Sequence, residues 1–246
     1  MKEEGYQPRT YRHWIEGKNL VSFNVTVKET DLYIRAKENI QRKARRMVLK
    51  YRTQLEKYVE KNPAFQKSLD PIDTSGDIPR IAGMMILAGQ KAGVGPMAAV
   101  AGAIAECVGQ ELLEFSPEVI VENGGDIFMK TLQRRVVGIY AGDSPLSGKI
   151  GVDIEGGEKP LGICTSSGTV GHSVSFGRAD AVVVVSDSTT LADAAATAIG
   201  NKVQSIDDIT NAIEFGNGIV GLKGLIIIKD DAIGVWGDIK LCEISA

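Results

Sequence analysis

Alternating apolar and polar residues near the start of the chain predict a β-hairpin. Every second residue from Val21 to Val27 is apolar and the residues between them are polar, which is typical of a half-buried strand. A polar turn at residues 29–31 separates this segment from a second apolar segment at 32–34. The pattern predicts that the two segments pair as antiparallel strands.

An apolar repeat of three to four residues then predicts a long amphipathic helix over residues 38–61. The apolar stripe runs from Ile40 to Val59, and Asn62-Pro63 ends the helix. We expect this stripe to face the protein core. The opposite face is expected in solvent with its basic side chains, Arg42, Lys43, Arg46, Lys50 and Lys57.

The rest of the chain alternates short strands with helices rich in small residues. Residues 64–77 are expected to be irregular, because turn residues are frequent there. The predicted helices cover residues 79–91, 96–114, 191–202 and 207–214. The predicted strands cover 119–121, 126–130, 136–140, 150–154, 161–164, 181–185, 225–228, 232–236 and 240–244. Hairpins and helices without a regular βαβ repeat favour an α+β fold. We expect one domain over residues 1–246, with the hairpin and helix of 1–62 integral to it.

Composition excludes several classes of protein. The 246 residues are 43% apolar and 24% charged, so disorder and fibre architectures are not expected. No apolar run reaches the roughly 18 residues of a membrane helix, and the first 14 residues lack the apolar segment of a secretory signal. Three widely spaced cysteines without a CxxC argue against a disulfide framework or structural zinc. We therefore expect a cytoplasmic protein without membrane contact.

Charge is unevenly spread along the chain. Residues 1–70 hold 16 Lys+Arg against 9 Asp+Glu, although the whole chain has a net charge of −3. Two interpretations stay open for the basic helix at 38–61. Its charged side is either a solvated face, which is the usual meaning of charge alone, or a surface associated with nucleic acid.

Three polar segments at the ends of predicted elements are candidates for chemistry. The first is Asn123-Gly124-Gly125-Asp126, between two apolar strands. Two adjacent glycines form either a plain hairpin turn or a close backbone approach to a phosphate or a flat ring. In the second case Asp126 would face a donor or a metal.

The second segment is a loop of hydroxyl residues followed by a histidine. It holds Ser166, Ser167, Gly168 and Thr169, with His172 three residues further on. Hydroxyls and backbone amides suit phosphate binding, and a histidine near neutral pKa suits a general base. The alternative for His172 is a structural histidine at the surface.

The third segment is an alanine-rich helix that carries Asp193 and Thr197. The two residues are four apart, so they share a helix face. A carboxylate and a hydroxyl are hard oxygen ligands suited to Mg²⁺ or Ca²⁺. The alternative is a hydrogen bond on the helix surface. We expect this helix, the Gly124-Gly125 turn and the 165–169 loop to meet at one pocket, because sites form where elements end.

Together these segments resemble the ApbE-like superfamily of FAD:protein FMN transferases. GGDI at 124–127, TSSG at 165–168 ahead of a histidine, and LADAAATA at 191–198 are similar to three of its signatures. GAIAE at 102–106 is similar to a family GAIAKG helix, with Glu106 at the lysine position. The hairpin segments LVSFNV and ETDLYI resemble a short branch of the superfamily over nearly the whole chain. The match to the transferases themselves covers about residues 95–203.

The resemblance implies a fold, ligands and a reaction. The fold would be a T-fold-like ApbE architecture with antiparallel sheets and packed helices. Asp193 and Thr197 would bind Mg²⁺ or Ca²⁺ at the diphosphate of FAD, with residues 123–126 and 166–169 around the cofactor. A Thr or Ser of an acceptor protein, deprotonated by His172, would take FMN as AMP leaves. Glu106 would either repel the phosphates or add a carboxylate to the metal shell.

Several functions remain open at this point. The resemblance favours a Mg²⁺-dependent flavin-nucleotide enzyme that transfers FMN or hydrolyses FAD. A second hypothesis is a protein that binds a nucleotide or another small ligand without chemistry. A third is a nucleic-acid-associated protein that uses the 38–61 helix. A homo-oligomer is compatible with each of them.

Overall fold

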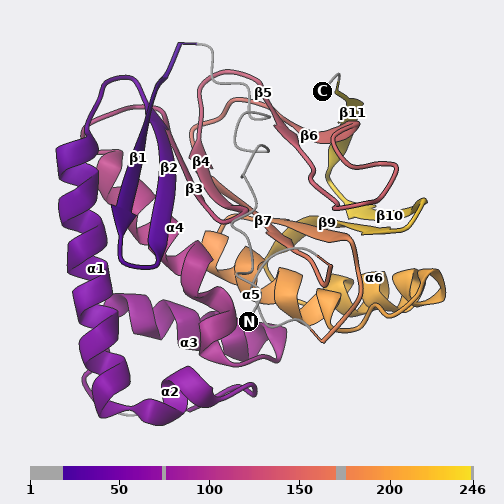
Figure 1. Cartoon of the computed structure of the whole chain (residues 1–246), viewed down its shortest axis with the longest axis horizontal. Helices are drawn as coiled ribbons and strands as arrows, with labels where there is room; N and C mark the ends of the chain where they lie inside the picture. Colours follow the sequence, from indigo (N-terminus) through magenta and orange to yellow (C-terminus); the bar gives the residue numbers. More distant parts are fainter. Residues whose placement is uncertain (1–18, 74–75, 170–175, 245–246) are drawn as a thin grey trace, which may run out of the picture.

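A computed structural model describes residues 19–73, 76–169 and 176–244, and it has three layers (Figure 1). Helices cover one face of a large antiparallel sheet, and a small antiparallel sheet covers part of the other face. This arrangement confirms the predicted α+β class with antiparallel sheets and packed helices.

The large sheet has eight strands in the order β1-β2-β3-β4-β7-β8-β9-β10, and every neighbouring pair is antiparallel. Its strands are β1 Val21–Val27, β2 Thr30–Ala36, β3 Val119–Asn123, β4 Asp126–Lys130, β7 Leu161–Ser166, β8 Ala181–Ser186, β9 Leu222–Lys229 and β10 Ala232–Gly237. The small sheet has the order β11-β6-β5. Its strands are β5 Arg135–Gly138, β6 Ile150–Ile154 and β11 Lys240–Glu243.

The helices lie mainly on one side of the large sheet. They are α1 Gln41–Lys61, α2 Pro63–Lys67, α3 Arg80–Ala92, α4 Val100–Leu112, α5 Thr189–Gly200 and α6 Ile209–Asn217, with 3₁₀ turns η2 Pro96–Ala99 and η3 Ile206–Asp208. No single described helix combines the length and apolarity of a membrane span. The pair Arg80–Ala92 and Pro96–Leu112 passes that test only as two segments bent by 107°.

The strand alternation divides the core into two parts. Along β8, Val182 and Val184 pack with the helices, whereas Ala181, Val183 and Val185 face the small sheet. Successive side chains of a strand point to opposite faces, so a continuous apolar run marks a strand that is covered on both sides. β8 is buried along its whole length for this reason.

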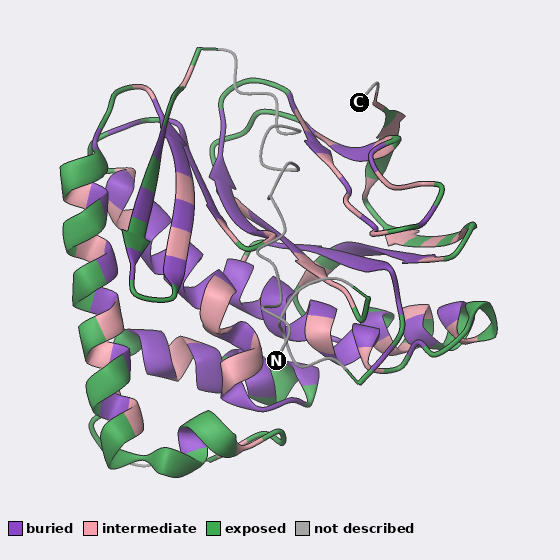
Figure 2. Cartoon of the chain, in the orientation of Figure 1, coloured by how far each residue is buried: buried purple, intermediate pink, exposed green. Residues whose placement is uncertain are grey.

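The long helix α1 packs as the sequence predicts. Ala44, Val48, Tyr51, Leu55 and Tyr58 are buried, while the opposite side is exposed (Figure 2). The helix begins at Gln41, three residues later than the apolar pattern predicts. The expectation of an irregular 64–77 segment is wrong at its start, because Pro63 begins the short helix α2 and buries Phe65 beneath it. Proline suits a first helical turn.

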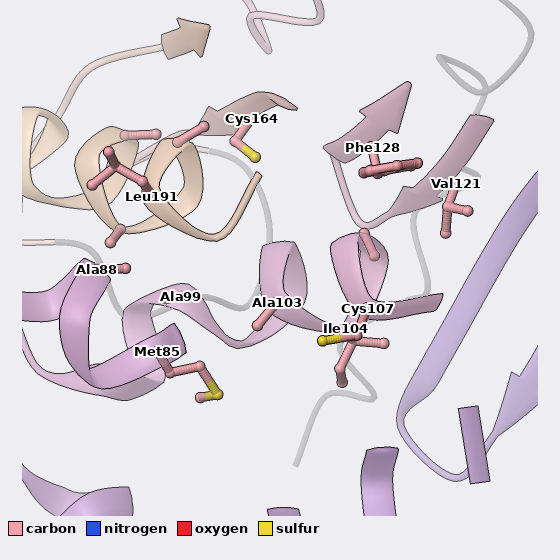
Figure 3. Packing of buried hydrophobic residues seen from close by; sticks show 14 of the residues in the cluster. Met85, Ala88, Ala99, Ala103, Ile104, Cys107, Val121, Phe128, Cys164 and Leu191 are labelled. Carbon is pink, nitrogen blue, oxygen red and sulfur yellow. The ribbon is translucent and has the colours of Figure 1, made fainter. Parts of the chain in front are cut away.

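Small residues bring α3, α4 and α5 close together and close to the sheet (Figure 3). A Cβ added to Gly102 on α4 would lie 2.5 Å from the carbonyl oxygen of Thr189, and one added to Gly162 on β7 would lie 2.4 Å from the Thr189 Cα. Both distances are shorter than real Cβ contacts allow. The start of α5 is therefore held between α4 and β7 by two glycines.

Candidate functional site

Asp193 connects the second turn of α5 to the first turn of α4. Its carboxylate accepts a 2.7 Å hydrogen bond from the Gly102 N–H, and the Ala101 backbone also hydrogen-bonds to it. The α4 helix has no side-chain cap of its own, so Asp193 satisfies N–H groups that would otherwise lack a partner. Burial raises the pKa of Asp193 to about 7, and the backbone hydrogen bonds oppose this shift.

Asp126 is a second buried acid beside Asp193. It begins β4 directly after Gly124 and Gly125, whose φ angles of 69° and 109° favour glycine. Burial raises the pKa of Asp126 well above its usual range, and the charge of Asp193 raises it further. One oxygen, Oδ1, is buried with no hydrogen-bond partner in the described part of the chain. Buried polar atoms are almost always paired, so this atom indicates a site for a donor or a cation.

Cys164 on β7 completes the buried cluster. Burial raises the pKa of its thiol, and the neighbouring charges of Asp126 and Asp193 add to the effect. The thiol hydrogen-bonds to Asp126, and it lies 3.3 Å from the carbonyl oxygen of Thr189. No motif in the sequence marks Cys164 as a site residue. Its position two residues before Ser166, on the helix-facing side of a strand, is the signal that could have found it.

The glycine turn is fixed by its neighbours on both sides. Asn123 donates from Nδ2 to the carbonyl oxygen of Ala101 at 3.0 Å, and Gly125 donates its N–H to Glu122 at 2.9 Å. A Cβ on Gly125 would lie 3.6 Å from the Thr165 carbonyl oxygen. The turn therefore lies against both the start of α4 and the end of β7.

The hydroxyl loop is only partly directed at this cluster. Ser167 and Thr169 hydrogen-bond to each other at 3.3 Å, and Thr169 donates to Asp180 at 3.1 Å. Gly168 donates its N–H to Ala179. These contacts tie the loop to the chain just before β8. The structure thus brings Gly125, Asp126 and Asp193 together near Thr165, while Ser167 and Thr169 make contacts with Asp180.

The remaining predicted site residues are Thr197, Ser166 and His172. Thr197 lies one turn beyond Asp193 on α5 and is half-buried. Ser166 ends β7, and its hydroxyl would lie 3.7 Å from a Cβ on Gly200, so it faces the last turn of α5. His172 lies outside the described residues.

The oxygen atoms present fit a cation that also has a phosphate ligand. Within the described ranges, no three His, Cys, Asp or Glu side chains are grouped so as to hold a metal ion by themselves. Mg²⁺ needs only one or two protein carboxylates when phosphates and water complete its shell. Asp126 Oδ1 and the Asp193 carboxylate would be the one or two protein carboxylates that such a Mg²⁺ ion needs.

Glu106 is hydrogen-bonded to the start of α5. Its Oε2 accepts hydrogen bonds from the Ser188 hydroxyl at 3.0 Å and from the N–H and hydroxyl of Thr190, each at 2.8 Å. Gln110 donates to Oε1 at 3.3 Å. Glu106 therefore places a buried carboxyl group at the N-terminus of α5, where the helix dipole favours negative charge. The helices α4 and α5 thus cap each other through Glu106 and Asp193.

Replacing Glu106 with glutamine is expected to lower the free energy of unfolding by about 2 kcal/mol, because hydrogen bonds to a charged group and the helix-dipole interaction are both weakened. Urea unfolding measures this change. The matched control is Glu60→Gln at an exposed position of α1, where we expect less than about 0.5 kcal/mol. Equal effects of the two substitutions would contradict the capping role.

Two hollows in the surface lie away from the acid pair. One has a volume of about 510 Å³ between α1 and the start of α3. The other has about 270 Å³ and is lined by Asp143, Ser144, Pro145, Asp180, Asp230 and Asp231. Neither is lined by Asp126 or Asp193, both of which are buried.

Comparisons with known proteins agree with this architecture. A family model described as AbpE bacteria matches residues 12–214. The chain is 42% identical over 221 residues to a UPF0280 protein of Methanocaldococcus jannaschii, covering 87% of this chain and 90% of that protein. It is 43% identical over 226 residues to one of Methanopyrus kandleri, covering 89% and 91%.

Solved structures show the same fold at low sequence identity. The crystal structure of Pseudomonas stutzeri flavinyl transferase ApbE, in its apo form, superposes with a TM-score of 0.54 at 12% identity. The match covers 88% of this chain and 93% of that one. The similarity confirms an ApbE-like fold. On the family model and the relatives together, the chain belongs to the UPF0280 family, whose family model is described as AbpE bacteria.

Proposed function

We propose that this chain binds a flavin nucleotide through a divalent cation at the Asp126–Asp193 pair and cleaves the diphosphate of FAD. The observation that carries the proposal is the buried Oδ1 of Asp126, which has no hydrogen-bond partner among the described residues, beside a second buried carboxylate. Two carboxylates in one buried cluster repel each other when both are ionised. A divalent cation removes that repulsion and offsets the cost of burying both charges.

The fold supports the choice of ligand. The protein with the ApbE-like fold named above is a flavinyl transferase, and the segments that resemble its superfamily contain both acids. On that basis we propose that the ligand of this chain is a flavin nucleotide. We also keep as proposals the T-fold-like architecture and the cytoplasmic location expected from the sequence. Mg²⁺ is the preferred cation, and Ca²⁺ is the alternative with the same ligand chemistry.

The proposed reaction is a phosphoryl transfer. A Ser or Thr hydroxyl of an acceptor protein forms a new bond to the phosphorus on the FMN side. The bond from that phosphorus to the bridging oxygen breaks, AMP leaves, and the hydroxyl proton passes to a base, for which His172 is the candidate. With water in place of the hydroxyl, the same step hydrolyses FAD to FMN and AMP. The cation would neutralise charge that develops on the phosphate oxygens.

This chain's own residues have defined tasks in such a site. Asp193 and Asp126 would hold the cation, with Thr197 as a further oxygen donor. The backbone of Gly124 and Gly125, which carry no side chains, leaves room for a close approach by the nucleotide. Asn123 fixes the turn to α4, so that the two acids keep their spacing.

Release of AMP tests the proposal. The protein is incubated with FAD and Mg²⁺, and AMP and FMN are separated by chromatography, with and without an added protein extract as acceptor. We expect AMP release by the wild type and a loss of at least about 100-fold in Asp193→Asn and Asp126→Asn. The control Asp187→Asn changes an exposed acid two residues before the first residue of α5 and should retain the activity. No AMP release from the wild type, or equal release by all four proteins, would contradict cleavage.

One observation favours a second candidate, nucleotide binding without cleavage. Glu106 occupies the N-terminus of α5 with its own carboxylate, where a helix otherwise offers N–H groups to a phosphate. A ligand would then lack that stabilisation as charge develops in the reaction. Tight, cation-dependent FAD binding without any AMP release would establish this second function.

A further inference from the structure

The outer face of α1 carries a row of cations that make no ion pair with any residue the structure describes. Arg42, Arg46, Lys57 and Lys61 are all exposed, and none of them makes an ion pair or a side-chain hydrogen bond in the part of the chain that is described. Arg52 of the same helix, by contrast, pairs with Glu29 and Glu56. We call these four residues the α1 basic row.

The α1 basic row is narrow and long. At 3.6 residues per turn, the four positions fall within about 100° of the helix circumference. At 1.5 Å per residue, they span about 28 Å along the axis. The helix lies at the edge of the molecule with this side uncovered (Figure 2), so a long ligand can reach the whole row.

A groove next to the row adds positive charge. The hollow of about 510 Å³ is lined by Lys50, Lys57 and Lys61 of α1 and by Arg80 at the start of α3. Its acids are Asp77 and Glu111, and Glu111 already binds Lys50 and the Tyr51 hydroxyl. The groove therefore has an excess of positive charge.

We propose that the α1 basic row and this groove bind the phosphate backbone of a double-stranded nucleic acid. Arg42 and Arg46 lie beyond the groove, so a small phosphorylated molecule seated in the groove would leave half of the row unused. A repeating polyanion uses all of it. Helix α1 contains eight Lys and Arg residues and two Glu residues, while the whole chain has a net charge of −3, so the positive potential is local to this face.

A duplex fits this face better than a single strand. Proteins that bind single strands stack bases on exposed aromatic rings. The two aromatic residues of the groove, Tyr51 and Tyr58, are 3% and 7% exposed and cannot offer a ring face. Contacts from Lys and Arg to phosphate are sufficient for sequence-independent duplex binding. The surface contains none of the residues assigned to the flavin nucleotide, so it acts independently of the proposed cleavage.

Salt-dependent binding to a fluorescent 20-base-pair DNA duplex tests this surface. Neutralising about four phosphates predicts that the logarithm of the association constant falls with the logarithm of salt concentration with a slope of about −3.6. Lys57→Gln/Lys61→Gln should reduce the steepness by about two and weaken binding at low salt by at least about tenfold. Arg42→Gln/Arg46→Gln, at the other end of the row, should reduce the steepness of the salt dependence and weaken binding by the same amounts.

The matched control is Lys149→Gln/Lys159→Gln, two exposed lysines outside the row. It should bind as the wild type does. Absence of duplex binding at about 50 mM salt overturns the proposal, as does an equal loss in the control. Preference for polyglutamate over the duplex would assign the surface to an acidic protein. Equal affinity for inorganic pyrophosphate and the duplex would assign it to a small phosphate ligand.

Discussion

The Asp193→Asn protein is expected to be more stable than the wild type without cations and to gain nothing from Mg²⁺. Burial raises the pKa of Asp193 to about 7, against about 3.9 in an unfolded chain. The ionised form is therefore disfavoured in the folded state. This penalty is absent below about pH 4, grows as the pH rises towards 7, and reaches the order of 4 kcal/mol above it. Asparagine has a neutral oxygen that can still accept from the Gly102 N–H.

Urea unfolding at pH 5 and pH 8, with and without Mg²⁺ and ADP, measures both effects. At pH 8 without cations, the variant should exceed the wild type in the free energy of unfolding, and at pH 5 the difference should shrink. With Mg²⁺ and ADP the wild type should gain stability and Asp193→Asn should not, because only a protein that binds the ligand is stabilised by it. Asp187→Asn, whose side chain is 64% exposed, should match the wild type throughout. A variant that is less stable in every condition would make Asp193 a purely structural capping residue.

Glu118→Gln is expected to lower the free energy of unfolding at pH 7 by about 3 kcal/mol. Burial alone would raise the pKa of Glu118. Hydrogen bonds from Lys37, the Leu132 N–H, Thr131 and Arg135 outweigh it and lower the pKa to about 2. Because the folded-state value is below the unfolded value of about 4.3, the stabilisation is complete above pH 4.3 and is lost as the pH falls towards 2. Neutral glutamine also leaves the buried Arg135 with less compensation.

The difference between Glu118→Gln and the wild type should therefore fade between pH 5 and pH 2.5. Urea unfolding across that range measures the change. The control is Glu158→Gln, whose side chain is 94% exposed, with an expected effect of less than about 0.5 kcal/mol at every pH. A destabilisation by Glu118→Gln that stays constant down to pH 2.5 would show that lost packing, and not lost charge, is responsible.

The periodicity of apolar residues predicts most of the fold, because a strand or helix with one buried side needs apolar residues at regular intervals. The alternation from Val21 to Val27 and the apolar stripe of α1 each have one buried side, and both elements are confirmed. Element ends are less well predicted, since local hydrogen bonds decide them. The expected helix at 96–114 begins with the 3₁₀ turn Pro96–Ala99 before α4, and the helix expected from residue 191 begins at Thr189, capped by Ser188.

The candidate site was predictable only where residue type reports chemistry directly. Asp126 and Asp193 are conspicuous as acids in apolar surroundings, and the structure brings them together. The mutual capping of helices α4 and α5 was not predictable, because Gly102 and Asp193 are 91 positions apart in the sequence. The contacts of Glu106 could not be predicted from the sequence either. Its charge suggests repulsion of a phosphate or a metal ligand, but only the fold reveals that it binds Thr190 at the start of α5.

Calorimetric titration of FAD into the protein, with Mg²⁺ and with EDTA, tests a cation at the Asp126–Asp193 pair most directly. We expect the wild type and Asp187→Asn to bind FAD only when Mg²⁺ is present, and we expect Asp126→Asn and Asp193→Asn to have lost this binding. FAD binding of equal strength with Mg²⁺ and with EDTA, or binding retained in both acid variants, would contradict a cation held by the Asp126–Asp193 pair.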